Sequence, residues 1–141
     1  MSTTKENEAS TRIVYVKGKI FSGSGKGAYF TALPWVRKQI KEKIGFMPHP
    51  GTLNVKLIGE FVEARKLLEN AKALEILPEP GYCSGKCFKG YIGKQNMLCA
   101  IVLPCIENYP RDVLEIVAPS NLREKLKLRD GDEVEVRIVL E

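Results

Sequence analysis

The sequence lacks the features of an exported or membrane-embedded protein. Its longest apolar run, residues 97–106, is interrupted by Pro104. The run falls well short of the roughly 20 residues that a membrane-spanning helix needs. Residues 1–12 are polar and charged and contain no apolar segment of the kind that a secretory signal carries. We therefore expect a cytoplasmic protein that does not interact with membranes.

Histidine and closely paired cysteines are also scarce, which argues against a zinc site. Cys83 and Cys87 are separated by three residues instead of two, no second close pair follows, and the single histidine, His49, lies far upstream. Cys99 lies within an apolar run and is expected to pack in the core. In the absence of an export signal, a disulfide is the less favoured interpretation of the cysteines.

Basic residues exceed acidic residues only modestly. The 22 Lys and Arg residues against 17 Asp and Glu residues give a net charge of +5. Such an excess favours an anionic partner, whether a nucleotide, a nucleic acid or an acidic membrane surface. Lysines and arginines on solvated faces are the simpler explanation for a surplus of this size. The charge alone therefore does not choose among these partners.

Chain length and hydrophobic periodicity predict one small β-barrel domain. A chain of this length suits a single hydrophobic core, which we assign to residues 13–141 after a flexible polar segment, residues 1–12. Alternating apolar residues predict a first strand at residues 13–21, with a bulge or bend at Gly18. Further strands are expected at residues 53–57, 87–92, 98–103, 113–117 and 133–139. Six strands favour a closed barrel, because closure removes exposed strand edges.

Two or three short helices should accompany the strands. The clearest spans residues 33–44, with Thr31 as its cap and Gly45 at its end. A second is expected at residues 62–72, with its charged residues, including Arg65, facing solvent. Its buried face is expected to consist of four apolar residues: Ala64, Leu67, Leu68 and Ala71.

A glycine-rich segment, SGSGKG at residues 22–27, follows the first predicted strand directly. Glycine allows backbone N–H groups to converge on an anion, because no Cβ stands in the way. The spacing matches neither the Walker A pattern nor the dinucleotide-binding pattern. A plain turn is the commoner role of such a loop, and Lys26 favours phosphate binding because its ammonium group can act as a point charge.

A rigid turn leads into the second predicted strand through residues 48–54, PHPGTLN. Strand alternation places Thr52 and Asn54 on the same side. A hydroxyl and an amide oxygen suit Mg²⁺, which prefers oxygen ligands and keeps several positions for water and phosphate. A nucleoside triphosphate brings its own negative charge, so such an ion does not need a carboxylate pair from the protein. The alternative is that the two residues simply form a polar strand face.

A carboxylate, Glu115, interrupts the apolar strand at residues 113–117. Such a residue either faces the surface or has a function, and the surface position is the simpler interpretation. Residues 120–123 follow, where Asn121 and Glu124 have the spacing of a capping box at the start of a short helix at residues 121–126. The beginning of a helix is a natural place for backbone groups to meet a ligand.

Four stretches in this order resemble the archaeal-type CTP-dependent riboflavin kinases. They read SGSGKGAYF, IGFMPHPGTLNVKL, AIVLP and DVLEIVAPSNLREKLKLRDGDEVEV, and the likeness covers about residues 13–139. The resemblance implies a mainly β fold, a six-stranded cradle-loop barrel. It also implies an enzyme that transfers the γ-phosphoryl group of Mg-CTP to the 5′-hydroxyl of riboflavin, giving FMN and CDP.

The resemblance further implies a role for each matching residue. Thr52 and Asn54 would ligate Mg²⁺, Glu115 would be the catalytic carboxylate, and Glu107 and Glu115 would contact the flavin. The nucleotide-binding residues would come from two segments: Gly23, Ser24, Gly25, Lys26, Gly27, Ala28 and Tyr29, and then Ser120, Asn121, Leu122 and Arg123.

Two positions depart from the family pattern. Glu107 stands where the family typically has threonine or another small polar residue, and Lys26 stands where glutamate is common. The lysine could tighten triphosphate binding or change the nucleotide preference. Because of these departures, a flavin-binding protein that has lost catalysis remains an alternative interpretation.

A nucleic-acid-binding barrel without enzymatic activity is the main alternative, because small basic barrels often bind DNA or RNA. The sequence has no row of aromatics interleaved with Lys and Arg, which such proteins commonly use. We therefore expect a monomer whose partners are riboflavin and CTP and not nucleic acid. Thermal stabilisation by CTP or FMN would favour the kinase, and salt-sensitive retention on nucleic acid would favour the alternative.

Overall fold

The computed structural model describes residues 12–23, 26–82, 84–105 and 108–140. These residues form seven strands, four α-helices and one 3₁₀ turn, Gly59–Phe61. The strands are β1 (Arg12–Phe21), β2 (Leu53–Leu57), β3 (Leu74–Ile76), β4 (Gly85–Ile92), β5 (Met97–Pro104), β6 (Val113–Val117) and β7 (Glu133–Leu140). The helices are α2 (Lys26–Ala32), α3 (Pro34–Ile44), α4 (Val62–Asn70) and α5 (Leu122–Leu126).

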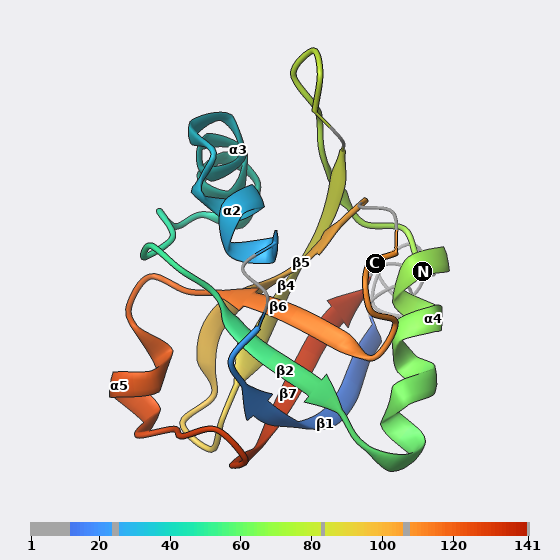
Figure 1. The fold of residues 1–141 in the computed structure, drawn as a ribbon, viewed down its shortest axis with the longest axis vertical. Coiled ribbons are helices and arrows are strands. Elements are labelled where there is room, and N and C mark those ends of the chain that lie inside the picture. Colours follow the sequence, from blue (N-terminus) through green and yellow to red (C-terminus); the bar gives the residue numbers. More distant parts are fainter. Residues whose placement is uncertain (1–11, 24–25, 83, 106–107, 141) are drawn as a thin grey trace, which may run out of the picture.

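The strands form one antiparallel sheet that closes on itself. Their order is β3-β4-β5-β6-β2-β1-β7, and β4 also pairs with β7, which closes six strands into a barrel (Figure 1). Strand β3 pairs with β4 at Gly85–Cys87, whereas β7 pairs with it at Gly90–Ile92. The predicted six-stranded barrel is therefore confirmed, and β3 is an additional strand.

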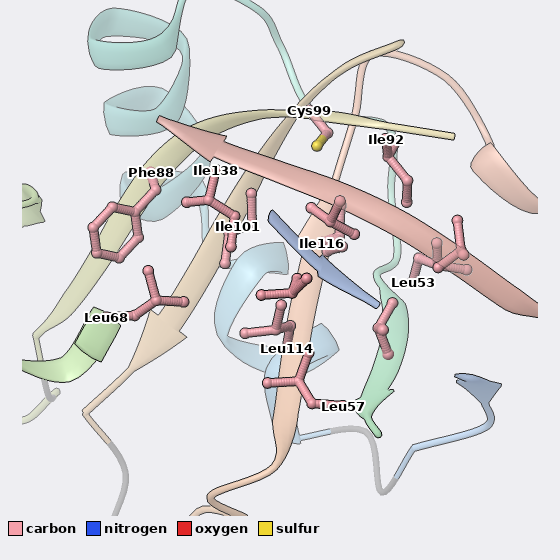
Figure 2. Close-up of a cluster of buried hydrophobic side chains, with 14 of the residues drawn as sticks. Leu53, Leu57, Leu68, Phe88, Ile92, Cys99, Ile101, Leu114, Ile116 and Ile138 are labelled. Carbon is pink, nitrogen blue, oxygen red and sulfur yellow. The ribbon is translucent and has the colours of Figure 1, made fainter. Parts of the chain in front are cut away.

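Alternate residues of the strands fill the barrel interior. In β2, for example, Leu53, Val55 and Leu57 are buried, whereas Asn54 is half-buried and Lys56 is exposed. Figure 2 shows the inward side chains of several strands meeting in one cluster. Cys99 belongs to this cluster, as predicted, and burial raises the pKa of its thiol to about 12. The Cys99 thiol therefore stays neutral near pH 7 and acts as a small apolar side chain.

Helices α2 and α3 cover part of the outer face of the sheet (Figure 1). Phe30, Val36 and Ile40 from these helices pack on residues of β4, β5 and β6 that point away from the interior. This second apolar layer explains why strands β5 and β6 are buried on both faces. The one carboxylate of β6, Glu115, is buried with the rest of the strand.

Two inward-facing glycines let the strands approach closely. A Cβ atom on Gly18 would lie 2.4 Å from Cγ1 of Val55, and one on Gly90 would lie 2.5 Å from Cδ1 of Ile101. Real Cβ atoms do not come this close, so a larger residue would force the strands apart. Of the two features predicted at Gly18, a bulge or a bend, the bulge is absent, because the pairing of β1 with β7 runs without a break from Arg12 to Lys19.

Three other expectations about the helices are wrong in detail. The residue that precedes α3 is Leu33, and Thr31 lies within the additional helix α2. In α4, Leu68 is fully buried, but Leu67 is 42% exposed and Arg65 is buried in its place. Arg65 tolerates burial because its Nε donates to the carbonyl oxygen of Val113 and its Nη1 donates to Glu69. Among the described residues, no helix is long and apolar enough to cross a membrane.

Candidate functional site

Three connecting segments meet at one end of the barrel. Strand β1 ends at Phe21 opposite Asn54, near the start of β2, and β2 begins opposite the end of β6. The turn before β2 is fixed by two hydrogen bonds, from the backbone N–H of His49 to Ala118 and from Nη2 of Arg37 to Pro48, both 2.7 Å. The glycine-rich segment, the PHPGT turn and the segment after β6 therefore lie at the same end.

The pairing of β2 with β6 places Asn54 directly opposite Glu115 on the outer face of the barrel. In the orientation assigned to the Asn54 amide from its hydrogen-bonding partners, its nitrogen donates to both carboxylate oxygens of Glu115, at 2.6 Å to Oε1 and 3.0 Å to Oε2. The Asn54 amide oxygen accepts a hydrogen bond from the backbone N–H of Gly23 at 3.1 Å. One amide thus joins the glycine-rich segment to the carboxylate.

Gly23 fits against this amide only because it has no side chain. A Cβ atom at this position would lie 2.7 Å from Cγ of Asn54 and 2.7–2.8 Å from the two terminal atoms of its amide. Any other residue would displace either the Asn54 amide or the glycine-rich segment. The glycine at position 23 is therefore needed for contact with Asn54.

Glu115 is buried, not surface-facing, with a relative exposure of only 5%. Besides the Asn54 amide, it accepts a hydrogen bond from the Tyr109 hydroxyl, which lies 2.6 Å from Oε2. A buried carboxylate needs such donors, because burial without hydrogen bonds would be strongly destabilising. The surface interpretation of Glu115 is wrong, and its hydrogen bonds explain how an apolar strand accommodates it.

Tyr109 is itself held by α4. The Arg65 guanidinium lies over its ring, 5.7 Å from the ring centroid, a geometry that allows a cation–π interaction. Burial raises the pKa of the Tyr109 hydroxyl well above its usual value, and the hydrogen bond to Glu115 raises it further. Tyr109 therefore stays protonated and donates its hydrogen to Glu115.

A pocket of about 200 Å³ opens beside this cluster, where β2 begins and β6 ends. It is lined by His49–Leu53, by Ile116 and Ala118, and by residues 120–123. The predicted magnesium ligand Thr52 and the predicted nucleotide-binding residues 120–123 thus line a single pocket. Asn121 also starts α5, since its side chain accepts a hydrogen bond from the backbone N–H of Glu124, as predicted.

Asp130 connects the two predicted nucleotide-binding segments. One carboxylate oxygen accepts from Nη2 of Arg123 at 2.7 Å, and the other accepts from the Ser22 hydroxyl at 2.9 Å. The hydrogen bond from Arg123 lowers the pKa of Asp130, and the hydrogen bond from Ser22 adds to the effect. The same guanidinium reaches the carbonyl oxygen of Phe21 at 3.4 Å. Arg123 is thereby held between the end of β1 and the turn before β7.

The structure connects the remaining predicted residues with the site less directly. Lys26, Gly27 and Ala28 belong to the first turn of α2, so a helix begins within the segment expected to be a loop. Tyr29, on the same helix, is 64% exposed. Ser24, Gly25 and Glu107 lie outside the described residues.

Sequence reasoning missed Asp130, Tyr109 and Arg65 as contributors to this site. No role is predicted for Asp130, and nothing in the sequence connects it with Ser22, which lies far away along the chain. Tyr109 precedes β6 in a segment without periodicity, and Arg65 lies among charged helix residues. Only the folded arrangement identifies these three.

The donor atoms at this end suit a hard cation bound together with phosphate. Thr52 offers a hydroxyl beside the pocket, and the Asn54 amide oxygen faces the glycine-rich segment. Oxygen donors of this kind match Mg²⁺. No group of three or more His, Cys, Asp or Glu side chains gathers into a metal site in the part of the chain that the structure describes.

The contacts of Asp130 predict how the stability of the protein changes with pH. Because the pKa of Asp130 is lowered from 3.8 in the folded protein, its hydrogen bonds stabilise the fold above that pH. Their contribution is lost as the pH falls through the lowered pKa. Asp130→Asn should therefore reduce the free energy of unfolding in urea at pH 7, and the difference from wild type should shrink as the pH falls below 3.8. Glu79→Gln, an exposed carboxylate elsewhere, is the control, and a difference that stays constant with pH would contradict this role.

Comparison with known proteins identifies the family. The model of the CTP-dependent riboflavin kinase family (CTP-dep_RFKase, described as a domain of unknown function, DUF120) matches residues 20–138. A riboflavin kinase of Pyrobaculum aerophilum is 40% identical over 141 aligned residues, which cover 95% of this chain and 63% of that protein. The riboflavin kinase of Archaeoglobus fulgidus is 39% identical, over 90% of this chain and 55% of that protein.

The extent of these alignments differs among the relatives. The chain spans about 55–63% of the length of the two relatives just named, and those proteins contain further sequence. A riboflavin kinase of Sulfurisphaera tokodaii is 39% identical over 136 aligned residues, which cover 92% of this chain and 98% of that protein. Each of these alignments covers most of this chain, and the chain belongs to the CTP-dependent riboflavin kinase family.

Proposed function

We propose that this chain is a riboflavin kinase that transfers the γ-phosphoryl group of Mg-CTP to the 5′-hydroxyl of riboflavin, giving FMN and CDP. The observation that carries the proposal is the hydrogen-bonded chain from Gly23 through Asn54 to Glu115. It joins the segments expected to hold the triphosphate, the metal and the acceptor hydroxyl. Its relatives named riboflavin kinase support the acceptor, and the family name supports CTP as the donor.

The nucleotide would lie over the pocket beside β2 and β6. Ser120, Asn121 and Arg123 offer polar groups there for the cytosine and ribose. Cytosine differs from uracil in its N4 amino donor and ring acceptors, so a few fixed hydrogen-bonding groups can distinguish them. The triphosphate would then extend toward Gly23 and the start of α2. Arg123, fixed by Asp130, supplies a positive charge at this end.

Thr52 and Asn54 would hold the metal ion between the pocket and the glycine-rich segment. When bound, Mg²⁺ would neutralise charge on the phosphate oxygens and help to orient the γ-phosphoryl group. The protein's own contribution is to fix the two oxygen donors on alternate backbone positions, on either side of Leu53. The Asn54 amide is already oriented by Glu115 and Gly23.

Glu115 would orient the acceptor hydroxyl and accept its proton. As the 5′-oxygen forms its bond to the γ-phosphorus, the bond from that phosphorus to the bridging oxygen of CDP breaks. The proton of the hydroxyl passes to the Glu115 carboxylate, while the released electrons leave with CDP. The protein accelerates such transfers mainly by positioning the reacting groups, because it takes little part in the covalent chemistry itself.

The first test is an FMN-formation assay with riboflavin and Mg²⁺, supplying CTP, UTP, GTP and ATP side by side. We expect FMN to form and CTP to be the best donor. Equal or faster turnover with ATP would contradict the nucleotide assignment. No FMN with any nucleotide, combined with salt-sensitive retention on nucleic acid, would favour the non-enzymatic alternative.

Thr52→Val tests the metal assignment, because it removes the hydroxyl and keeps the shape of the side chain. The Mg²⁺ concentration for half-maximal activity should rise at least roughly tenfold, the lower end of the losses seen when metal sites are disturbed. Asn54→Ala should have a larger effect, since it also removes the hydrogen bonds to Glu115. Circular dichroism checks that both variants fold. Unchanged activity of both at limiting Mg²⁺ would exclude these ligands.

Glu115→Gln tests the role of the carboxylate, because it keeps the shape and one acceptor oxygen but removes the charge and the basicity. General acid–base groups typically contribute roughly 100- to 10,000-fold to the rate. A loss of kcat in this range, with CTP affinity intact, would support proton transfer. A loss of a few-fold would leave Glu115 as an orienting group. Unchanged turnover and riboflavin affinity would remove it from the site.

A further inference from the structure

We propose that Tyr109 is a positioning residue for the phosphoryl transfer, whose hydroxyl holds Glu115 so that Oε1 of the carboxylate remains available to the acceptor hydroxyl. The inference rests on the proposed function and adds a residue that the sequence pattern did not single out. It follows from how the hydrogen-bonding capacity of Glu115 is used.

The two carboxylate oxygens of Glu115 are used unequally. Oε2 accepts from the Tyr109 hydroxyl at 2.6 Å and from the Asn54 amide at 3.0 Å, whereas Oε1 accepts only the Asn54 amide at 2.6 Å among the described residues. A carboxylate offers about four acceptor positions, two on each oxygen. Among the described residues, Oε2 therefore has two donors and Oε1 has one, so more of the remaining acceptor capacity lies on Oε1.

Tyr109 is well suited to impose this asymmetry. Its O–H is a donor toward Glu115, and its raised pKa keeps that hydrogen in place across the range in which the protein would work. The ring is fixed by the Arg65 guanidinium. Arg65 in turn is held by the carbonyl oxygen of Val113, at the start of β6. The phenol is thus supported from α4 and from the strand that carries Glu115.

Without the phenol, the carboxylate would keep only the Asn54 amide among these partners. It could then rotate about its last bond and present either oxygen, so the acceptor hydroxyl would meet a less ordered base. Placement of reacting groups within a fraction of an ångström strongly affects the rate. Removal of the Tyr109 hydroxyl should therefore slow the chemical step more than it weakens binding of either substrate.

The decisive variant is Tyr109→Phe, which removes one oxygen and leaves the ring against Arg65. We expect kcat to fall roughly 10- to 100-fold, the factor that corresponds to a hydrogen bond to a charged group. The KM values for CTP and riboflavin should stay within about twofold, because the lost interaction acts on the transition state. Tyr15→Phe is the matched control, since Tyr15 also has a glutamate, Glu135 on β7, as a neighbour. It should leave kcat unchanged.

A double-mutant cycle shows whether Tyr109 acts through Glu115. In a Glu115→Gln background, Tyr109→Phe should cause little further loss of kcat, because the group that it positions is already absent. The same loss in both backgrounds would overturn the proposal. An unchanged kcat in Tyr109→Phe would also overturn it. A rise in both KM values with kcat intact would overturn it too, because that result would indicate that Tyr109 only packs against its neighbours.

A second readout separates this inference from the proposed function. The wild type, the two single variants and the double variant are unfolded in urea, and the shifts in their unfolding midpoints are compared. Non-additive shifts support the Tyr109–Glu115 contact, and additive shifts overturn the proposal whatever the kinetics show. If the wild-type chain forms no FMN, the proposed function fails. Non-additive midpoints would then still establish the contact, whereas its assignment to phosphoryl transfer would be overturned.

Discussion

The alignment of β2 with β6 is the constraint on which the candidate site depends. It sets Asn54 opposite Glu115 on the outer face, while Leu53 and Ile116 point into the barrel. Because side chains alternate along a strand, a slip of one residue would bring one member of the polar pair into the apolar interior. The core therefore fixes the polar pair, and the contacts of Gly23 and Tyr109 follow from it.

The same contacts serve stability and chemistry. A carboxylate buried on an apolar strand is tolerated only when donors surround it, and low polarity strengthens each hydrogen bond that it makes. Glu115 receives these donors from β2 and from the segment before β6. Helix α4 adds a buried arginine over that segment. A group held so firmly is prearranged for a reaction, because it does not have to reorganise when a substrate arrives.

The sequence predicts the strands well because their alternation is local. The barrel, β2 and β6 and the start of α5 were expected from residues that are close in the chain. The register between β2 and β6 was not predictable, since it depends on how two distant strands share one core. Arg65 was misplaced because helical periodicity counts apolar residues and cannot show that a guanidinium will find a backbone carbonyl.

The start of α2 shows another limit of local patterns. Its first turn carries no acidic residue and its residues show little periodicity, yet the helix begins at Lys26, within the glycine-rich segment. Packing of Phe30 against the outer face of β4–β6 supplies what the local sequence does not. The proposed roles of the site residues came from family resemblance, and the structure adds the contacts through which some of them would act together.

The inward-facing glycines have a consequence for how such a fold can change. At Gly18 and Gly90, the space that a Cβ atom would occupy is already filled by side chains from neighbouring strands. The lumen is therefore solid, in contrast to larger barrels that enclose a ligand. Molecules must bind at the rim or on the outer wall, where the connecting segments lie. Adaptation to a new substrate could thus proceed through those segments while the interior strands stay the same.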